Sequence, residues 1–380
     1  MDFHEVANIF PLMEGVEFES LVSDIKVNGL IEPIWVYEGK IIDGRNRYKA
    51  CQKLDIAPEY KDYEGDNALS FVISLNLKRR HLNESQRAVV ASRLANMKHG
   101  GDRKSDQVAN LPLDISQHEA AEMLNVSERM IRTVKTIERD APELMPEIES
   151  GKITAHQAER KVKSNEREQV RYQLAQKGLD VKQSERWNIY HGDMKTIELN
   201  KQYDFIITDP PYPKEYLPLW EALAIRSKEL LSPGGLLIAM SGQLYLNQIY
   251  EILDRHLSYY WTACYLTLHQ PTPLRTRNVN TTWKPILIYS LGGKYVGKIF
   301  GDVYQSPQPE KTNHDWEQSI DGMYALIKQI CLPGQSILDP FCGSGTTGKA
   351  ALQHGCFFDG IDLDIENVKI SRARLDDTKT

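Results

Sequence analysis

The stretch that decides the fold is residues 336–347, SILDPFCGSGTT. A short apolar run that ends at Asp339 predicts a buried strand, and the glycines after it predict a turn into a helix. Gly343 and Gly345 allow the backbone to approach a ligand closely. Roughly twenty residues further on, Asp362 ends the next apolar run and is placed to contact ribose hydroxyls. The segment therefore predicts a nucleoside-binding strand–helix–strand unit, although its loop differs from the Gly-x-Gly-x-x-Gly pattern of dinucleotide sites.

A second loop carries the candidate reactive residues. Asp209-Pro210-Pro211-Tyr212 follows the apolar run 204–208. Two consecutive prolines fix φ and end the predicted strand. The result is a stiff loop that holds one carboxylate and one aromatic ring at the edge of a sheet, where open α/β sheets bind their ligands. This arrangement suits the gripping of a planar base that carries an amino group.

Together these motifs resemble those of the amino-methylating DNA methyltransferases, which use S-adenosylmethionine. Residues 209–212 match the family's catalytic motif D/N/S-P-P-Y/F/W, and residues 339–345 match its cofactor motif D-x-F-x-G-x-G. The catalytic motif comes first, which is the order of the family's β class. The resemblance covers residues 186–380 and implies a Rossmann-like α/β catalytic domain.

The resemblance also implies which residues contact the cofactor. The acid of the turn His191-Gly192-Asp193 is similar to one that contacts the cofactor's adenine. The full expected set is Asp193, Asp339, Phe341, Cys342, Gly343, Ser344, Gly345, Thr346 and Asp362. Cys342 is expected to be a small packing residue, because methylation at cytosine carbon 5 needs an activated thiolate and the chain contains no Pro-Cys dipeptide.

The expected chemistry is methyl transfer to an exocyclic amino group. Asp209 and the carbonyl of Pro210 would accept hydrogen bonds from that group and aim its lone pair at the methyl. Tyr212 would stack on the flipped base. Because Asp in the first motif position is commoner for adenine N6 in this family, adenine is favoured and cytosine N4 is the alternative. A DNA-binding regulator or partition protein with a non-catalytic methyltransferase domain is the alternative from another class.

The first part of the chain resembles a different family. Residues 25–95 are similar to the N-terminal domain of ParB-type partition proteins, an α+β fold shared with sulfiredoxin, and residues 41–50 match its G-E-R-R box imperfectly. In that family the box forms a nucleotide or phosphate pocket, so CTP is a candidate ligand. The residues expected there are Gly44, Arg45, Arg47, Asn76 and Arg79. Arg45 replaces the Glu of the box and Leu75 replaces a later acid, so a basic surface for DNA or a partner is the alternative.

Residues 117–137 predict a helix-turn-helix. Ser116 and Glu119 form a capping box, Asn125 stands where a left-handed backbone is tolerable, and Ser127 caps a second helix. The pattern resembles the motif of KorB-like proteins and implies DNA binding, with a helical pair used only for packing as the alternative. The residues expected to reach DNA are Arg129, Arg132 and Thr133, with Arg275 and Arg277 of a second stretch, 270–283, that is expected to be either a DNA-contacting or a solvated loop.

The chain is therefore expected to be modular. The predicted parts are a ParB-like domain (1–98), a linker (99–114), an all-α helix-turn-helix domain (115–165), a charged helical linker (166–185) and the methyltransferase domain (186–380). Double-stranded DNA is the expected partner, and a homodimer is a candidate assembly.

Composition adds exclusions. The net charge is −6, which does not itself indicate nucleic-acid binding, so binding has to rely on local basic patches. The five cysteines lack C-x-x-C spacing, so we expect no metal site and no disulfide framework. No apolar run is long enough to span a membrane. We expect a cytoplasmic, nucleoid-associated protein of a prokaryote or phage.

Overall fold

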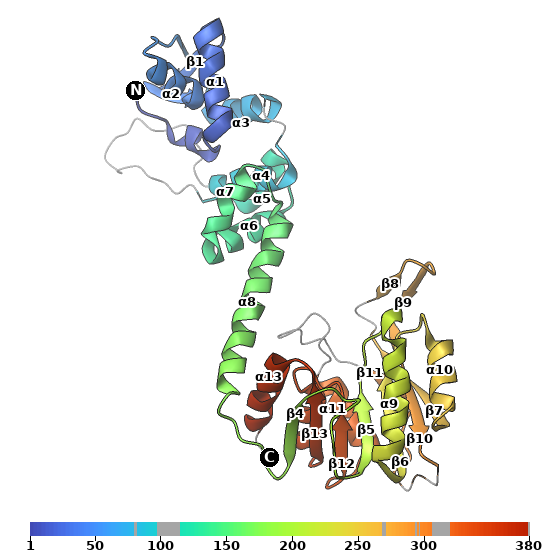
Figure 1. Cartoon of the computed structure of the whole chain (residues 1–380). Coiled ribbons are helices and arrows are strands. Elements are labelled where there is room, and N and C mark those ends of the chain that lie inside the picture. Colours follow the sequence, from blue (N-terminus) through green and yellow to red (C-terminus); the bar gives the residue numbers. More distant parts are fainter. Residues whose placement is uncertain are drawn as a thin grey trace. The chain divides into compact units, whose positions relative to one another are not determined.

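The computed structural model describes residues 1–79, 82–96, 115–267, 271–292, 295, 297–305 and 320–378, with the side chains of residues 78 and 79 left out. The predicted linker 99–114 therefore lies entirely outside the described residues. The chain divides into two compact units, Met1–Asn165 and Glu166–Thr380. Figure 1 labels their helices and strands.

Unit 1 begins with a small α+β layer. Its three-stranded sheet has the order β2-β1-β3, with β1 antiparallel to β2 and parallel to β3. The elements are η1 (Glu5–Ile9), α1 (Gly15–Asn28), β1 (Ile34–Tyr37), β2 (Lys40–Asp43), α2 (Arg45–Leu54), β3 (Tyr60–Asp62) and α3 (Ala68–Arg79). Ile42 of β2 and Val72 of α3 pack in one core cluster with residues of the helices that follow.

A helical layer completes unit 1. It contains α4 (Glu84–Leu94), α5 (Gln117–Leu124), α6 (Glu128–Asp140), η2 (Pro142–Leu144), α7 (Met145–Glu149) and the start of α8 (Ala155–Lys177). The predicted capping box of Ser116 and Glu119 is confirmed, Asn125 is left-handed with φ 50°, and the Ser127 side chain caps α6. These local hydrogen bonds set the helix boundaries that the sequence predicts.

Unit 2 is a mixed eight-stranded sheet of order β11-β7-β10-β6-β5-β12-β13-β4, which confirms the α/β class. Among these strands β10 runs opposite to both of its neighbours. The strands are β4 (Trp187–His191), β5 (Tyr203–Thr208), β6 (Leu231–Met240), β7 (Ser258–Leu266), β10 (Trp283–Ser290), β11 (Val303–Gln305), β12 (Ser336–Asp339) and β13 (Phe357–Asp362).

Helices cover both faces of this sheet (Figure 1). One core cluster contains α11 (Ile320–Ile330), α12 (Thr346–Gln353) and α13 (Ile365–Asp376); the other contains α9 (Leu217–Leu230) and α10 (Leu246–Asp254). Successive side chains of the central strand β5 pack alternately into the two clusters: Phe205 and Ile207 lie in one and Ile206 lies in the other. Strands buried on both faces are apolar throughout, which explains why the sequence shows runs here.

Two stretches differ from their expected form. Residues 270–283, expected as a loop, contain the hairpin of β8 (Thr272–Leu274) and β9 (Val279–Thr281), paired antiparallel. The end of α8, expected to be part of a linker, packs within unit 2: Arg171 donates to Asn367 of α13 at 3.1 Å. Gly178 then passes so close to α13 that an added Cβ would lie 1.8 Å from the carbonyl oxygen of Lys369.

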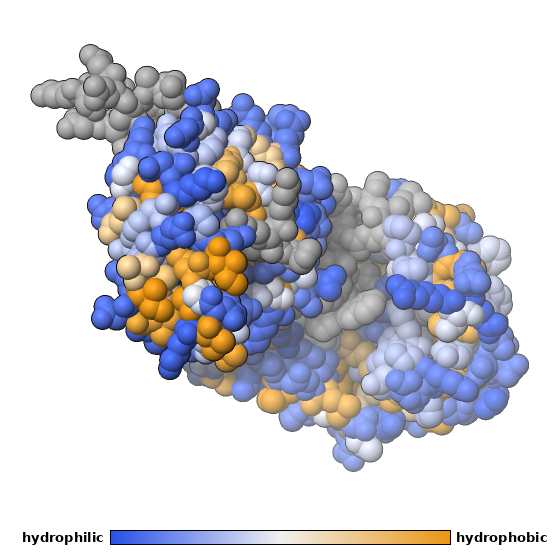
Figure 2. Space-filling model, turned by 90° about the horizontal axis from the view of Figure 1, so that it is seen from above, coloured by the Kyte–Doolittle hydropathy of each residue, from blue (hydrophilic) through white to orange (hydrophobic). Residues whose placement is uncertain are grey.

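The face shown in Figure 2 is mostly hydrophilic, with apolar residues among the polar ones. Exposed apolar side chains are normal on folded proteins. None of the helices among the described residues is both long enough and apolar enough to cross a membrane.

Candidate active site

Two loops lie side by side at the point where the strand order of the sheet in unit 2 reverses. The chain leaves β5 toward β6 on one side, and it leaves β12 toward β13 on the other, while β5 and β12 pair in parallel. The carboxyl ends of neighbouring strands at such a switch point form the ligand site of open α/β sheets. Thr208, the last residue of β5, donates a hydrogen bond of 2.7 Å from its hydroxyl to Oδ1 of Asp339, the last residue of β12. The predicted catalytic loop (residues 209–212) and the glycine-rich loop (residues 339–345) therefore start side by side.

The backbone conformation of the glycine-rich loop depends on its glycines and leaves space for a ligand. Gly343 and Gly345 have φ angles of 51° and 83°, a region that favours glycine. Gly345 is the N-cap of α12, and no side chain caps that helix end. A Cβ added to Gly343 would meet no other atom within 4 Å, so open space lies above the loop. The N-terminus of a helix behind a loop of glycines suits a polar, nucleoside-like ligand.

Asp339 is a buried carboxylate beneath this loop, 3% exposed. Burial raises its pKa to about 6, opposed by hydrogen bonds from Thr208, Thr347 and the N–H of Phe341, while the nearby charge of Asp209 adds to the rise. The N–H of Phe341 donates to Oδ1 of Asp339 at 3.1 Å. Asp339 therefore fixes the start of the loop through accepted hydrogen bonds.

Cys342 is buried and its thiol pKa is raised, chiefly by burial and further by Asp339 and Asp362. It packs where Gly360 leaves space, since a Cβ on Gly360 would lie 2.8 Å from the Cys342 sulfur. A thiol that resists ionisation is a poor nucleophile. The surroundings of Cys342 thus agree with its expected packing role.

Two of the acids expected to contact the cofactor, Asp362 and Asp193, lie at or just after the ends of neighbouring strands. β13 pairs with β4 through Asp362 and His191, and Asp193 follows two residues later. Oδ2 of Asp362 accepts from the N–H of Gly343 at 2.9 Å, and its Oδ1 accepts from the N–H of Asp364 at 2.9 Å and from Asn367 at 3.2 Å. Asp362 supports the glycine-rich loop in addition to any ligand contact. Thr346 is buried at the start of α12, and Phe341 packs against the core cluster of α9 and α10.

Two side chains of the catalytic loop are hydrogen-bonded to each other, and a lysine from β10 lies beside both. The hydroxyl of Tyr212 donates to Oδ1 of Asp209, and the ammonium of Lys284 lies 3.7 Å from Oδ2 and 5.1 Å from the centroid of the Tyr212 ring. Burial, and secondly Asp209, raise the Tyr212 pKa well above its ordinary value, so its hydroxyl remains a donor. A carboxylate and a ring thus stand together beside the glycine-rich loop.

Residues 203–373 match the family model N6_N4_Mtase, described as DNA methylase. Both loops lie inside the matched segment. The chain is 38% identical over 84 residues to the DNA adenine methyltransferase YhdJ of Escherichia coli (strain K12), which covers 21% of this chain and only 29% of that relative. It is 24% identical over 226 residues to the Type II methyltransferase M.HpaI of Haemophilus parainfluenzae, covering 48% of this chain and 71% of that protein. A solved structure, the M1.HpyAVI–SAM complex, aligns with 27% identity and a TM-score of 0.43, covering 50% of this chain and 98% of that one.

Near the loop of residues 209–212, the β8–β9 hairpin exposes Arg275 and Arg277. Its base is tied to the loop after β6, because the amide of Gln243 donates to the hydroxyl of Thr281 at 2.6 Å and to the carbonyl of Trp283. The hairpin therefore starts next to the catalytic loop while its arginines remain open to solvent.

In unit 1 the segment predicted as a helix-turn-helix exposes Arg129 and Arg132 on α6, with Thr133 half-buried beside them. The opposite face of α6 is buried through Met130, Ile131, Val134 and Ile137. Arg87 of α4 fastens the turn by donating to the carbonyls of Leu82 at 2.9 Å, Leu124 at 3.0 Å and Asn125 at 3.2 Å. The sequence did not indicate this role of Arg87, because it depends on α4 packing against α5 and α6.

A separate pocket of about 220 Å³ lies in the α+β layer of unit 1. It gathers Gly44, Arg45, Arg47 and Asn76, four of the residues expected there. The side chain of the fifth, Arg79, lies outside the described part of the structure. Gly44 has φ 96° and begins α2 without a side-chain cap. Gly44, Arg45 and Arg47 thus lie at the N-terminus of α2, and Asn76 of α3 lines the same pocket.

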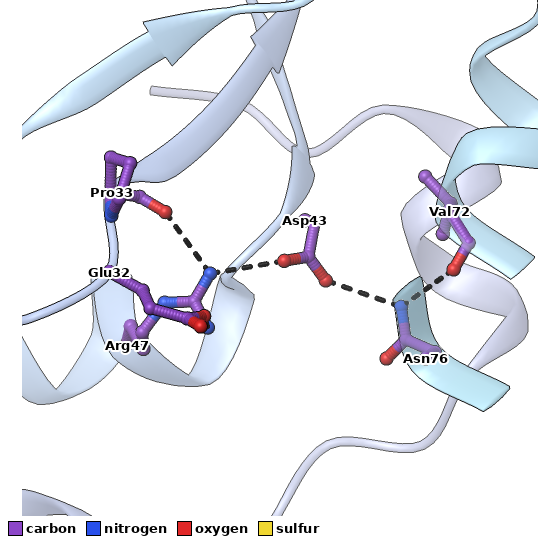
Figure 3. Close-up of polar contacts among 6 residues, drawn as sticks. All are labelled: Glu32, Pro33, Asp43, Arg47, Val72 and Asn76. Atoms are coloured by element: carbon purple, nitrogen blue, oxygen red, sulfur yellow. Dashed lines mark hydrogen bonds and ion pairs between the residues drawn. The ribbon is translucent and has the colours of Figure 1, made fainter. Parts of the chain in front are cut away.

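Most polar groups of this pocket already have protein partners (Figure 3), although Nε of Arg47 is buried and has none among the described residues. Arg47 donates to Asp43 at 3.0 Å and to the carbonyl of Pro33 at 3.1 Å, with Glu32 at 3.3 Å. Asn76 donates to Asp43 at 3.2 Å, and Arg45 donates to Asn8 at 2.7 Å. Sequence reasoning missed Asp43, which links Arg47 to Asn76.

Proposed function

We propose that this chain is a DNA methyltransferase that uses S-adenosylmethionine and acts on an exocyclic amino group. The observation that carries the proposal is the hydrogen bond between Thr208 and Asp339, which joins the Asp209–Tyr212 loop to the glycine-rich loop. The match of residues 203–373 to a DNA methylase family supports it. Such adjacency is what methyl transfer between a bound nucleoside cofactor and a base requires.

The cofactor would be held by the loop from Asp339 to Gly345, with Asp193 and Asp362 at the adjoining strand ends. It would supply an electrophilic methyl group. The protein supplies position and charge: Asp209 and the carbonyl of Pro210 accept hydrogen bonds from the amino group and orient its lone pair. Tyr212 offers a ring for stacking on a base drawn out of the duplex. The nitrogen loses one proton as it is methylated, and Asp209 is the carboxylate beside it.

Adenine N6 is the target base position that we favour. Asp209 at the first motif position supports it, as does the similarity to YhdJ, a DNA adenine methyltransferase. Cytosine N4 is the runner-up within the same chemistry. The two are separated by digesting methylated DNA to nucleosides and identifying the product by mass spectrometry.

We assign unit 1 to targeting. The exposed Arg129 and Arg132 on α6, opposite its buried face, support binding of that helix in the major groove of DNA. Arg275 and Arg277 would contact DNA close to the flipped base. A truncated chain, residues 166–380, tests this assignment, because it keeps the packing of α8 on α13. Equal methylation of the same sites by the truncated and full chains would contradict it.

The pocket of unit 1 is the basis of a second candidate function, binding of a phosphate-bearing small ligand such as CTP. The uncapped N-terminus of α2 and the nearby Arg45 and Arg47 support it. Because both guanidinium groups are paired with protein oxygens, a phosphate has to displace or share those partners. CTP titration by calorimetry, with Arg47→Ala as the control, tests it. Absence of saturable binding at roughly millimolar nucleotide, a Kd that would correspond to about −4 kcal/mol, would end this idea.

Tritiated methyl transfer to DNA that lacks both modified bases is the decisive experiment for the main proposal. Wild type is expected to label the DNA, and Asp209→Ala is expected to lose roughly 100-fold or more, as is typical when a positioning and charge-stabilising group is removed. Equal labelling by both proteins would contradict the assigned chemistry. DNA binding with no labelling by wild type would support the alternative, a regulator whose methyltransferase domain is not catalytic.

A further inference from the structure

Lys284 reaches the catalytic loop because of the one reversed strand. β10 is antiparallel to β6, with Ile286 opposite Met240, so its first residues lie beside the carboxyl ends of the parallel strands. The N–H of Ser241 donates to the carbonyl of Pro285 at 3.0 Å and fixes this register. Lys284 is therefore placed by the sheet itself at the edge where Asp209 and Tyr212 stand.

The two oxygens of Asp209 have different partners. Oδ1 accepts from the hydroxyl of Tyr212, while Oδ2 lies 3.7 Å from the ammonium of Lys284. The side chains of Lys284 and Asp209 are only 27% and 24% exposed, so their pairing is partly shielded from water. This differs from a solvent-exposed ion pair, which contributes little.

The partner of Oδ1 is also the ring expected to stack on the base. If Tyr212 turns its ring to a base, its hydroxyl leaves Oδ1, and that oxygen becomes an acceptor for the amino group. Lys284 does not depend on this movement, since it is carried by β10 and not by the catalytic loop. Gly242 gives the ring a close neighbour, because a Cβ added there would lie 3.4 Å from Cγ of Tyr212.

Resting on the proposed function, we propose that Lys284 is a positioning residue for Asp209. It holds Oδ2 and keeps the carboxylate oriented, so that Oδ1 is offered to the amino group when Tyr212 leaves. The charge is required in this position, because a half-buried ammonium 3.7 Å from Oδ2 attracts that oxygen and restrains the rotation of the carboxylate. Lys284 itself touches neither the base nor the methyl group in this scheme.

The test compares Lys284→Met, Lys284→Gln and Lys284→Arg with wild type in the full-length chain. Single-turnover methyl transfer to unmethylated genomic DNA gives the rate, calorimetry gives the affinity for S-adenosylmethionine, and fluorescence anisotropy gives the affinity for duplex DNA. Lys228→Met is the matched control, since Lys228 is an exposed lysine of α9. Circular dichroism checks that each variant folds. If Lys284→Met does not fold, Lys284→Gln is the neutral variant that tests the proposal.

We expect the neutral variants to lose roughly 10- to 100-fold in rate, as for other groups that position a reacting partner. Both affinities should stay within about twofold of wild type, and Lys284→Arg should recover most of the rate because it keeps the charge. A wild-type rate in both neutral variants would overturn the proposal, as would a loss confined to DNA affinity or a lack of recovery in a folded Lys284→Arg. Failure of wild type to methylate DNA would instead refute the proposed function.

Discussion

The hydroxyl of Ser371 donates a hydrogen bond of 2.7 Å to the carbonyl oxygen of Gly343 and thereby ties α13 to the glycine-rich loop. The N–H of the same glycine donates to Asp362 at the end of β13. Arg374 of α13 adds two bonds to Ser344, at 2.8 Å to its carbonyl and 2.7 Å to its hydroxyl. The loop is therefore shaped by α13 and β13 before any ligand is bound.

Removal of the Ser371 hydroxyl should weaken cofactor binding. Ser371→Ala leaves a carbonyl without its buried donor, which costs about 1–3 kcal/mol. Part of that cost falls on the loop shape that the ligand needs, so we expect roughly 5- to 10-fold weaker binding of S-adenosylmethionine by calorimetry, about 1–1.4 kcal/mol. Ser227→Ala is the matched control, because Ser227 is a buried serine of α9 whose hydroxyl has no hydrogen-bond partner among the described residues. Unchanged affinity in Ser371→Ala would show that the loop does not depend on α13.

Asp339 should make the protein less stable as the pH rises. Its pKa is raised from 3.8 to about 6 in the folded chain, so the folded state binds a proton in this range that the unfolded state has lost. Stability from this residue is therefore lost as pH rises from about 4 to 6, by up to about 3 kcal/mol. Asp339→Asn has no carboxyl group to ionise. The melting temperature of this variant minus that of wild type should therefore be larger at about pH 8 than at about pH 5.

Calorimetric melting of the full chain at both pH values measures that difference. Asp180→Asn, which changes an exposed carboxylate before β4, should shift the melting temperature equally at both. A pH-independent shift in Asp339→Asn would contradict the raised pKa. The same variant should bind S-adenosylmethionine less well, because the loop would lose an ionised acceptor for Thr208 and Phe341.

The sequence predicts both loops correctly because their signals are local. An apolar run, two prolines and two glycines at positions of positive φ specify the ends of β5 and β12 without knowledge of distant residues. Lys284 could not be found in this way, because its approach to Asp209 depends on a reversed strand and on pairing across the sheet. Asp362 is expected from the sequence to contact ribose hydroxyls. Its oxygens also accept hydrogen bonds from Gly343 and Asn367, and the contact with Gly343 depends on the tertiary fold.

The hairpin of β8 and β9 shows a second limit. Proline, asparagine and arginine are poor strand formers, so residues 270–283 favour a loop by composition. Cross-strand pairing of Thr272 with Thr281 and of Leu274 with Val279 overrides that preference. The capping box of Ser116 and Glu119, in contrast, involves residues three apart and is confirmed.

Loss of the Arg87 side chain should loosen the packing of α5 and α6 around the turn that joins them. Its guanidinium is the donor to three backbone carbonyls around the turn, at Leu82, Leu124 and Asn125. Arg87→Met keeps an apolar stem but removes every one of these bonds, and we expect a loss of about 2–3 kcal/mol in the stability of unit 1. Hydrogen exchange followed by mass spectrometry should show faster exchange in α5 and α6. Arg160→Met, an exposed arginine of α8, is the control, and equal exchange in both variants would contradict the role of Arg87.

The exposed face of α6 should set how tightly the protein binds DNA. Arg129 and Arg132 lie three positions apart on one side of the helix and are exposed, and the capping hydroxyl of Ser127 fixes where the helix begins. Alanine at either position should cost about 1–3 kcal/mol of specific DNA affinity if the side chain reaches a base edge. In methyl-transfer assays this should appear as a higher KM for DNA with kcat unchanged, because the proposed site of methyl transfer lies in unit 2.

Arg139→Ala is the matched control on the same helix, since Arg139 is already paired with Asp140 at 2.6 Å. It should change KM little. A phosphate contact by Arg129 or Arg132 would instead weaken binding to all sequences alike and reduce the salt dependence of affinity. If both alanine variants match wild type in DNA affinity at low and high salt, α6 is a packing helix and the targeting role of unit 1 is wrong.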